Sequence, residues 1–191
     1  MKLLATFLVC YLIGSTTSAF AQQKHEVERG VREEAIPATA LGWLDQIAPE
    51  DKVQWYFEET SGKKSFEAKY KKNGTRYSVE FDTTGVLEDV EIIKRWGDLA
   101  PELQQELLKH FETTYRKHKI RKIQQQISGD EQVVRKWLLD GNAPDIVYRY
   151  EIEYYAKSEN GKALWEGVFD DKGVELSKRK VILRPTDNLN Y

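Results

Sequence analysis

The stretches Tyr77–Val86, YSVEFDTTGV, and Trp165–Val174, WEGVFDDKGV, share one pattern without a gap. Each runs from an aromatic residue through alternating positions to Phe-Asp, two variable residues and Gly-Val. Asp favours the start of a tight turn, and Gly readily takes the positive φ that such a turn requires. Two unrelated hairpins could share such a turn, but the order of the elements around it also repeats. We therefore interpret the stretches as equivalent turns of a duplicated unit.

The first unit begins with apolar residues at helical spacing. Ile36, Ala40, Leu44 and Ile47 predict a short helix that ends before Pro49. Because apolar and polar residues then alternate, we expect antiparallel strands with one face buried under the helix and the other face open. The predicted strands are 53–58, 66–70, 76–81 and 86–93, and Asn73-Gly74 is a predicted hairpin turn.

The second unit repeats this order with a longer helix. We expect Asp98 to cap a helix whose apolar stripe is Leu99, Leu103, Leu107, Phe111 and Tyr115. The predicted strands are 120–127, 146–156, 164–169 and 174–183, with a short helical insertion at 130–140 that Gly141 ends.

The expected fold class is α+β: a tandem repeat of a helix plus a four-stranded antiparallel sheet, with the helices on one face of a continuous sheet. A cystatin-like fold, with one long helix wrapped by a single curved sheet, is the alternative. It leaves the first helix and the repeated turn unexplained. The expected segments are a signal peptide 1–21, a flexible leader 22–34, unit 1 at 35–96, unit 2 at 97–184 and a tail 185–191.

The N-terminus has the three-part pattern of a secretory signal peptide. Lys2 precedes the apolar run 3–13, and Ala19-Phe20-Ala21 predicts cleavage after Ala21. The run has about half of the roughly 20 residues that span a bilayer, so a retained anchor is the weaker alternative. Cys10 lies inside the run without the small preceding residue of a lipoprotein site, so lipid attachment is also the weaker alternative. We expect a periplasmic or secreted mature chain without cysteine.

Charge and motifs limit the possible functions. The chain has 29 Lys and Arg against 31 Asp and Glu, which argues against nucleic-acid binding. His25, His110 and His118 lack zinc-site spacing, and neither a nucleophile elbow nor a phosphate-binding loop is present. Paired acids such as Asp170 and Asp171 are interpreted as solvated turn residues rather than a glycosidase pair. We expect no catalytic residue, no metal and no cofactor.

The open sheet face supplies the candidate binding residues. Tyr and Arg are residue types that anchor protein interfaces, and alternation places several of them on this face. An ordinary solvated face with scattered aromatic residues is the alternative interpretation. The predicted partner-binding residues are Tyr56, Arg76, Glu80, Arg149, Glu151 and Tyr155.

Several short motifs follow one another in a recognisable order. They are Ile36-Pro37-Ala38, Lys52-Val53-Gln54-Trp55, Phe66-Glu67-Ala68, Tyr77–Gly85 and Leu99-Ala100-Pro101-Glu102-Leu103. In this order they resemble the PepSY-like, beta-lactamase-inhibitor-like proteins that Bacteroidetes export. The resemblance covers 36–127 well and 148–181 more loosely, and the insertion around Trp137 departs from it. It implies PepSY-like units in an eight-stranded antiparallel sheet and a role in extracytoplasmic binding or inhibition.

We therefore expect an exported, non-catalytic binding or inhibitor-like module whose open sheet face holds a protein or peptide partner outside the cytoplasm. The alternative is a periplasmic small-molecule carrier or envelope structural factor with a pocket between helix and sheet. An enzyme is the third and least favoured interpretation, because no nucleophile, metal set or phosphate loop is present.

Overall fold

The computed structural model describes residues 23–24, 26–47, 52–60, 62–158 and 161–182. Ten strands form one sheet in the order β1-β10-β9-β8-β7-β6-β5-β4-β3-β2. Neighbouring strands are antiparallel except β1 and β10, which are parallel. The strands are β1 Gln23–Lys24, β2 Glu26–Val31, β3 Gln54–Thr60, β4 Lys63–Lys72, β5 Thr75–Asp82, β6 Leu87–Lys94, β7 Lys117–Ser128, β8 Val147–Ser158, β9 Gly161–Asp170 and β10 Glu175–Val181.

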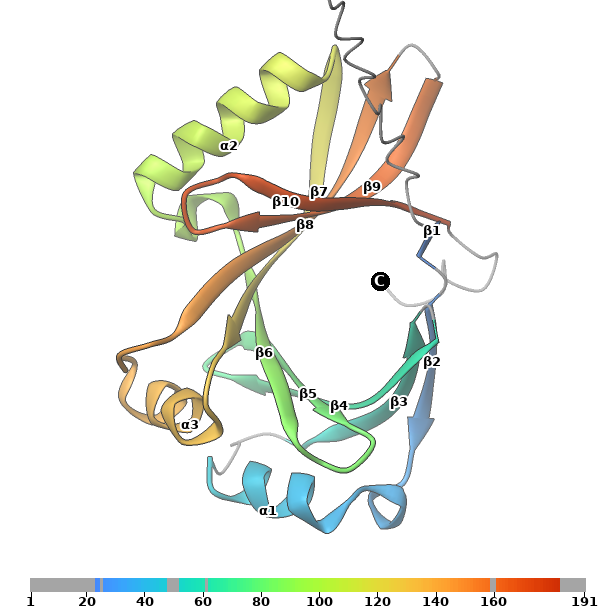
Figure 1. Ribbon diagram of the computed structural model, residues 1–191, viewed down its shortest axis with the longest axis vertical. Coiled ribbons are helices and arrows are strands. Elements are labelled where there is room, and N and C mark those ends of the chain that lie inside the picture. Colours follow the sequence, from blue (N-terminus) through green and yellow to red (C-terminus); the bar gives the residue numbers. More distant parts are fainter. Residues whose placement is uncertain (1–22, 25, 48–51, 61, 159–160, 183–191) are drawn as a thin grey trace, which may run out of the picture.

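The helices lie on the outer side of the curved sheet, away from its hollow (Figure 1). They are α1 Ala38–Asp45, α2 Pro101–Thr114 and α3 Glu131–Asp140, with short 3-10 turns at Glu33–Ala35 and Trp96–Asp98. Asp130 caps α3 through a hydrogen bond from Gln132 N, and Gly141 ends it with φ +76°. The α+β class and the helical insertion are therefore as predicted, and the sheet has ten strands where the resemblance implied eight.

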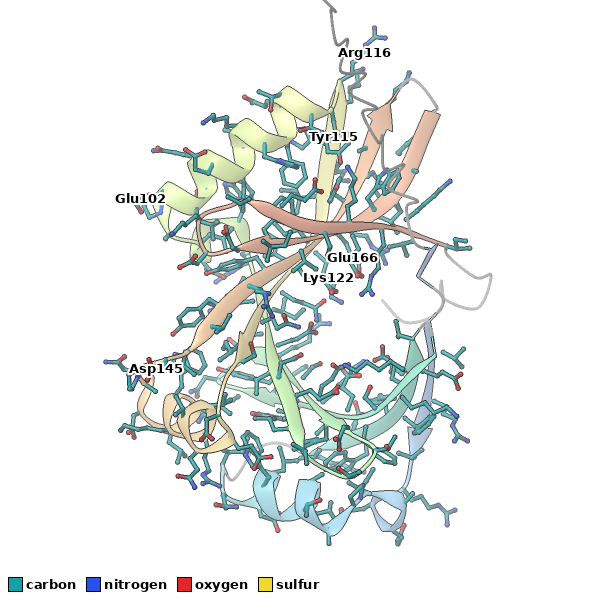
Figure 2. All side chains as sticks on the ribbon, in the orientation of Figure 1. Glu102, Tyr115, Arg116, Lys122, Asp145 and Glu166 are labelled. Atoms are coloured by element: carbon teal, nitrogen blue, oxygen red, sulfur yellow. The ribbon has the colours of Figure 1, made fainter. Side chains whose placement is uncertain are left out.

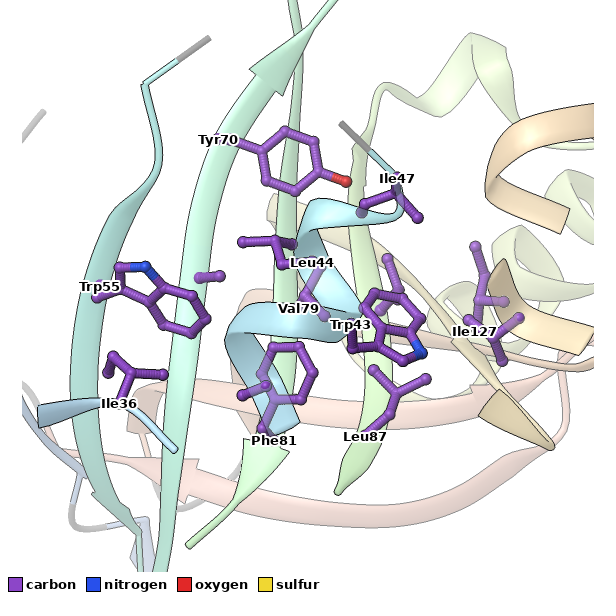
Figure 3. Packing of buried hydrophobic residues seen from close by; sticks show 14 of the residues in the cluster. Ile36, Trp43, Leu44, Ile47, Trp55, Tyr70, Val79, Phe81, Leu87 and Ile127 are labelled. Atoms are coloured by element: carbon purple, nitrogen blue, oxygen red, sulfur yellow. The ribbon is translucent and has the colours of Figure 1, made fainter. Parts of the chain in front are cut away.

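Two hydrophobic clusters fill the space between the helices and the sheet. Trp43 of α1 packs edge-on against Phe81 at 5.7 Å in the first cluster, shown in Figure 3. Phe111 of α2 packs against Tyr154 at 4.8 Å in the second cluster. Burial of such side chains contributes roughly 1.5–3 kcal/mol each. Alternation along each strand therefore assigns one face to the core and leaves the opposite face polar.

The repeated turns have matching hydrogen bonds. Asp82 Oδ1 accepts from Thr84 N and Val86 N, and Asp170 Oδ1 accepts from Lys172 N and Val174 N. Each turn also has a glycine at positive φ, Gly85 at +88° and Gly173 at +79°. At both turns, therefore, the Asp side chain accepts backbone hydrogen bonds and the Gly takes a positive φ, as the sequence pattern predicted.

Gly85 is needed for a second reason, because the first turn lies against the start of α1. An added Cβ would lie 2.0 Å from Thr39 Oγ1 and 2.8 Å from Pro37 Cβ. Thr39 Oγ1 donates to Thr84 O at 2.8 Å, which ties the helix to the turn. At Gly173 the nearest atom would be Glu106 Cβ of α2, at 3.0 Å. Each turn thus closely approaches the helix that covers its half of the sheet.

The segment 22–34 was expected to be a flexible leader, and this expectation was wrong. Residues Glu26–Val31 form β2, which pairs with β3 through Arg29 opposite Phe57 and Val31 opposite Trp55. The segment reads as polar because β2 is an edge strand, and charged side chains are common on such edges.

The start of α2 also differs from the sequence interpretation. Pro101 occupies the first helical position, where its missing N–H costs nothing, and Asp98 lies in the preceding 3-10 turn. Asp98 accepts from Arg95 N at 2.9 Å instead of capping α2. Because α1 and α2 both cover the sheet, the cystatin-like alternative with one helix does not describe this fold.

The predicted signal peptide, its cleavage site and Cys10 lie outside the described residues, as does the tail 185–191. None of the helices in the described part of the chain combines the length and apolar character needed to cross a membrane.

We predict that Gly85→Ala destabilises the protein by about 2–4 kcal/mol, because the methyl group meets α1 and the residue must keep a positive φ. Gly74→Ala is the matched control, since Gly74 has φ +76° but no atom within 4 Å of an added Cβ. Its expected cost is only about 1 kcal/mol. Urea unfolding measures both, and equal costs would show that contact with α1 contributes nothing.

Candidate functional site

The uncovered face of the sheet curves into an open groove of about 2230 Å³. Side chains of β2 to β10 line it, together with Trp96 and with Leu108 and Phe111 of α2. In Figure 2, Lys122 and Glu166 lie on the hollow side of the strands, whereas Glu102 lies on the outer surface of α2. The polar strand face of the groove therefore lies opposite the hydrophobic clusters, of which Tyr70, Phe111 and Ile123 also reach the groove lining.

The two edges of the sheet meet across the mouth of this groove. β1 pairs with β10 at one edge, and β2 pairs with β3 at the other edge. A single residue separates Lys24 of β1 from Glu26 of β2, so their Cα atoms lie within about 7 Å. Figure 1 shows β1 and β2 on the same side of the hollow. The sheet is therefore bent almost into a ring around the groove.

The structure brings four of the six predicted binding residues together. Tyr56, Arg76, Glu80 and Glu151 line the groove. Lys69 Nζ lies 4.8 Å above the Tyr56 ring, so this tyrosine is held in place by a cation–π contact.

The other two predicted residues lie elsewhere on β8. Arg149 is exposed near the start of the strand, opposite Asp170, and is not among the residues that line the groove. Tyr155 lines a separate pocket of about 310 Å³, where Lys162 Nζ lies 4.7 Å from its ring. Arg149 and Tyr155 thus lie on the same face of β8 as Glu151, but only Glu151 lines the groove.

A row of acidic side chains crosses the floor of the groove. Glu67 of β4 lies directly opposite Glu80 of β5, which lies opposite Asp89 of β6. Glu91 follows two residues after Asp89 on the same strand face. Like charges placed directly opposite one another destabilise a sheet. Sequence alternation places Asp89 and Glu91 on the open face, but only the register shows that they adjoin Glu80.

The outer acids of the groove have cationic partners. Lys69 Nζ lies 2.9 Å from Glu67 and 2.7 Å from Glu28. Arg179 pairs with Glu151 at 3.5 Å and also with Glu166. These ion pairs neutralise the flanks of the row.

The central carboxylates, which we define as Glu80, Asp89 and Glu91, differ from these outer acids. Among the described residues none of them has a cation within 4.0 Å. Glutamine amides contact two of them: Gln126 donates to Asp89 at 3.0 Å, and Gln124 donates to Glu91. The centre of the floor is thus polar, acidic and without a counter-ion in the described part of the chain.

Two buried acceptor atoms in this centre receive no hydrogen bond from the described residues. They are Oδ1 of Asp89, a residue that is 8% exposed, and Oε1 of Gln124, a residue that is 6% exposed. A buried acceptor without a donor costs about 1–3 kcal/mol. Native proteins usually satisfy such atoms, so these two acceptors on the groove floor are exceptional.

The pKa values of all three central carboxylates are raised above those of ordinary carboxyl groups. Burial, with the nearby charges of Asp89 and Glu58, raises the pKa of Glu80 to about 8. Burial likewise raises the pKa of Asp89 to about 7, against the opposing effect of Lys63. Burial and the charge of Glu151 also raise the pKa of Glu91. At neutral pH a proton on Glu80 therefore takes the place of a counter-ion.

The described residues contain no group of three or more His, Cys, Asp or Glu side chains placed to hold a metal ion. The groove presents carboxylates, carboxamides and a tyrosine, which are suited to hydrogen bonding and to ion pairing with a donor.

No sequence family and no curated protein matches the chain. Solved structures do share its fold. A DUF2874 family protein from Bacteroides ovatus ATCC 8483 has a TM-score of 0.54 and 14% identity, covering 81% of this chain and 98% of that chain. A BLIP-like protein from Bacteroides fragilis NCTC 9343 has a TM-score of 0.50 and 14% identity, covering 82% and 92%. A protein described as periplasmic, from Bacteroides eggerthii DSM 20697, has a TM-score of 0.52 and 11% identity, covering 76% and 88%.

At these identities the similarity establishes the fold. The chain has the α+β architecture of BLIP-like proteins of Bacteroides, and this part of the resemblance seen in the sequence is confirmed.

We predict that Glu80→Gln makes the protein less sensitive to alkaline pH. Glu80 keeps its proton up to about pH 8 when folded but loses it near 4.5 when unfolded, so its stabilising contribution declines as the pH rises between these values. The difference in unfolding free energy between variant and wild type should grow by about 2 kcal/mol from pH 5 to pH 8.5. Urea unfolding at both pH values measures it.

Glu102→Gln, on the exposed side of α2, is the control and should leave the difference constant. If the unfolding free energies of wild type and Glu80→Gln change by the same amount between pH 5 and pH 8.5, the raised pKa of Glu80 is contradicted.

Proposed function

We propose that this protein is an exported, non-catalytic binding module that holds a segment of a protein or peptide partner in the groove. The observation that carries the proposal is the floor of the groove, where buried acceptors and carboxylates without a cation face an open space of about 2230 Å³. Such a floor is costly for the free protein, and a ligand that supplies donors would repay part of that cost.

Tyr56, Arg76, Glu80 and Glu151 are the proposed contact residues within the groove. Tyr56 offers a large rigid surface, and Arg76 offers a forked set of donors. Arg149 and Tyr155, which lie on the same face of β8, are proposed to contact parts of the partner that extend beyond the groove.

We further propose that the fold is a duplication of PepSY-like units, divided at 35–96 and 97–184. The matching Asp-x-x-Gly turns support it, as does the order of α1 with four strands and α2 with four strands. Export is proposed from the signal-peptide pattern, and the fold is shared with a protein described as periplasmic.

The small-molecule carrier has less support. A carrier of that kind needs space between helix and sheet, and the two clusters around Trp43 and Phe111 fill that region with buried side chains. The groove lies on the other face of the sheet.

Site-specific photo-crosslinking tests the proposal. We expect a benzophenone amino acid at position 56 to yield a crosslinked partner in the native host, because this position faces the groove. The same amino acid at Leu139, which is 55% exposed on α3, is the matched control and should yield none. Mass spectrometry identifies the adducts. Adducts only at position 139, or the same adducts at both positions, would contradict the groove as the binding surface.

A further inference from the structure

We infer that the groove recognises an extended peptide segment in which Lys or Arg and Asp or Glu stand four residues apart. The cationic head lies among the central carboxylates, and the acidic residue lies at the basic end of the groove. This inference rests on the proposed function and adds the chemistry of the partner.

The central carboxylates have the geometry to surround one cationic head. Glu80 and Asp89 are directly opposite on neighbouring strands, so their Cβ atoms are about 5 Å apart. Glu91 lies on the same face of β6, two residues or roughly 7 Å away. Three carboxylates at these spacings can contact one ammonium or guanidinium group, which offers three or five donors.

The unpaired acceptors are a second and independent indication of a donor-rich ligand. Gln124 is uncharged, yet its Oε1 is buried in the groove without a hydrogen bond from any described residue, and Asp89 Oδ1 on the neighbouring strand also lacks one. Gln124 Oε1 can only accept, and Asp89 Oδ1 accepts when its carboxyl group is ionised. A ligand group without acceptors, such as Lys or Arg, is the type that satisfies them after small rotations of the two side chains.

One end of the groove has the opposite charge. Lys71 and Arg76 are paired across β4 and β5. At the same end of the groove lie Lys52, two residues before β3, and Lys94, the last residue of β6. Within the described residues none of these four cations has an ion pair. The groove therefore changes from basic at this end to acidic at its centre.

The register sets the spacing between the two charged regions. Glu67 marks the acidic row on β4, and Lys71 marks the basic end four residues later. Four residues of a strand span about 13 Å. An extended ligand that lies along the groove covers the same distance with four residues, which fixes the separation of its two charges.

Binding of a cation should release protons from the central carboxylates, because the cation favours their ionised forms. The charged and amide groups that face them are Glu58 of β3, Lys63 and Glu67 of β4, Glu88 of β6, Lys122, Gln124 and Gln126 of β7, and Glu151 of β8. The affinity should therefore rise between pH 6 and pH 8.5, by about tenfold if one proton is released.

The test uses the peptide acetyl-Gly-Arg-Gly-Ser-Gly-Glu-Gly-amide at low ionic strength. NMR titration of the ¹⁵N-labelled mature chain should give saturable shifts in β5 to β7. The ¹³C carboxyl shifts of Glu80 and Asp89 should move toward the ionised form at pH 7 as the peptide binds. Replacing the arginine by citrulline, which is uncharged, should weaken binding at least tenfold. Moving the glutamate to two residues from the arginine should also weaken binding, but by a smaller factor than the citrulline replacement.

The protein variant for this test is Glu80→Gln with Asp89→Asn and Glu91→Gln, which should bind at least tenfold more weakly. Its control is Glu102→Gln with Glu112→Gln and Asp171→Asn, three exposed positions outside the groove lining, which changes the net charge equally and should bind like wild type. Because neutralising the central carboxylates removes repulsion, we expect the first variant to fold, and its amide spectrum verifies this.

Several results would overturn the inference: no saturable shifts with wild type, equal affinity of the two triple variants, or equal binding of the citrulline peptide. Saturable binding of Ca²⁺ at the same residues without peptide binding would also overturn it, in favour of a metal ion. If crosslinking at position 56 still captures a partner in any of these cases, the proposed function stands and only the charge pattern is wrong.

Discussion

The structure depends on one constraint, which is that every strand keeps its apolar side chains on the face that the helices cover. Val79 lies between Ala68 and Val90 in one cross-strand row of that face, and Glu80 lies between Glu67 and Asp89 in the adjacent row of the other face. A register slip by one residue would exchange the two rows, placing carboxylates beneath α1 and valines in the groove. The same pairing that forms the core therefore also forms the polar floor of the groove.

The acidic floor of the groove lowers the stability of the folded protein, whereas the hydrophobic core raises it. Three acids in one cross-strand row repel one another, and Asp89 is nearly as buried as the apolar residues behind it. Sheets ordinarily avoid such rows by alternating charge, as Lys69 does beside Glu67 in the next row. Folding tolerates the acidic row because the hydrophobic clusters on the opposite face are large. A polar surface that costs stability is characteristic of functional sites.

Much of the fold could be predicted from the sequence, because strong local signals such as the Asn73-Gly74 turn and the α2 stripe coincide with the long-range packing. β2 was missed because an edge strand needs no apolar alternation on its open side. The candidate site was recovered only partly. Alternation assigns Glu80 and Arg149 to the same face. Only Glu80 lies in the groove, because the curvature that forms the groove is a property of the whole sheet. The neighbours of Glu80 follow from strand register, which residue patterns do not specify.

The closure of the sheet has a consequence for the order of folding. Gln23 pairs with Lys180, so the first and last strands of the described chain meet, and among the described strand pairings this one closes the longest loop. The hairpins β3 to β6 and β7 to β10 need only nearby residues and can form before the ring is complete. The groove is then the last part of the described sheet to form, because the ring around it is complete only once β1 has paired with β10.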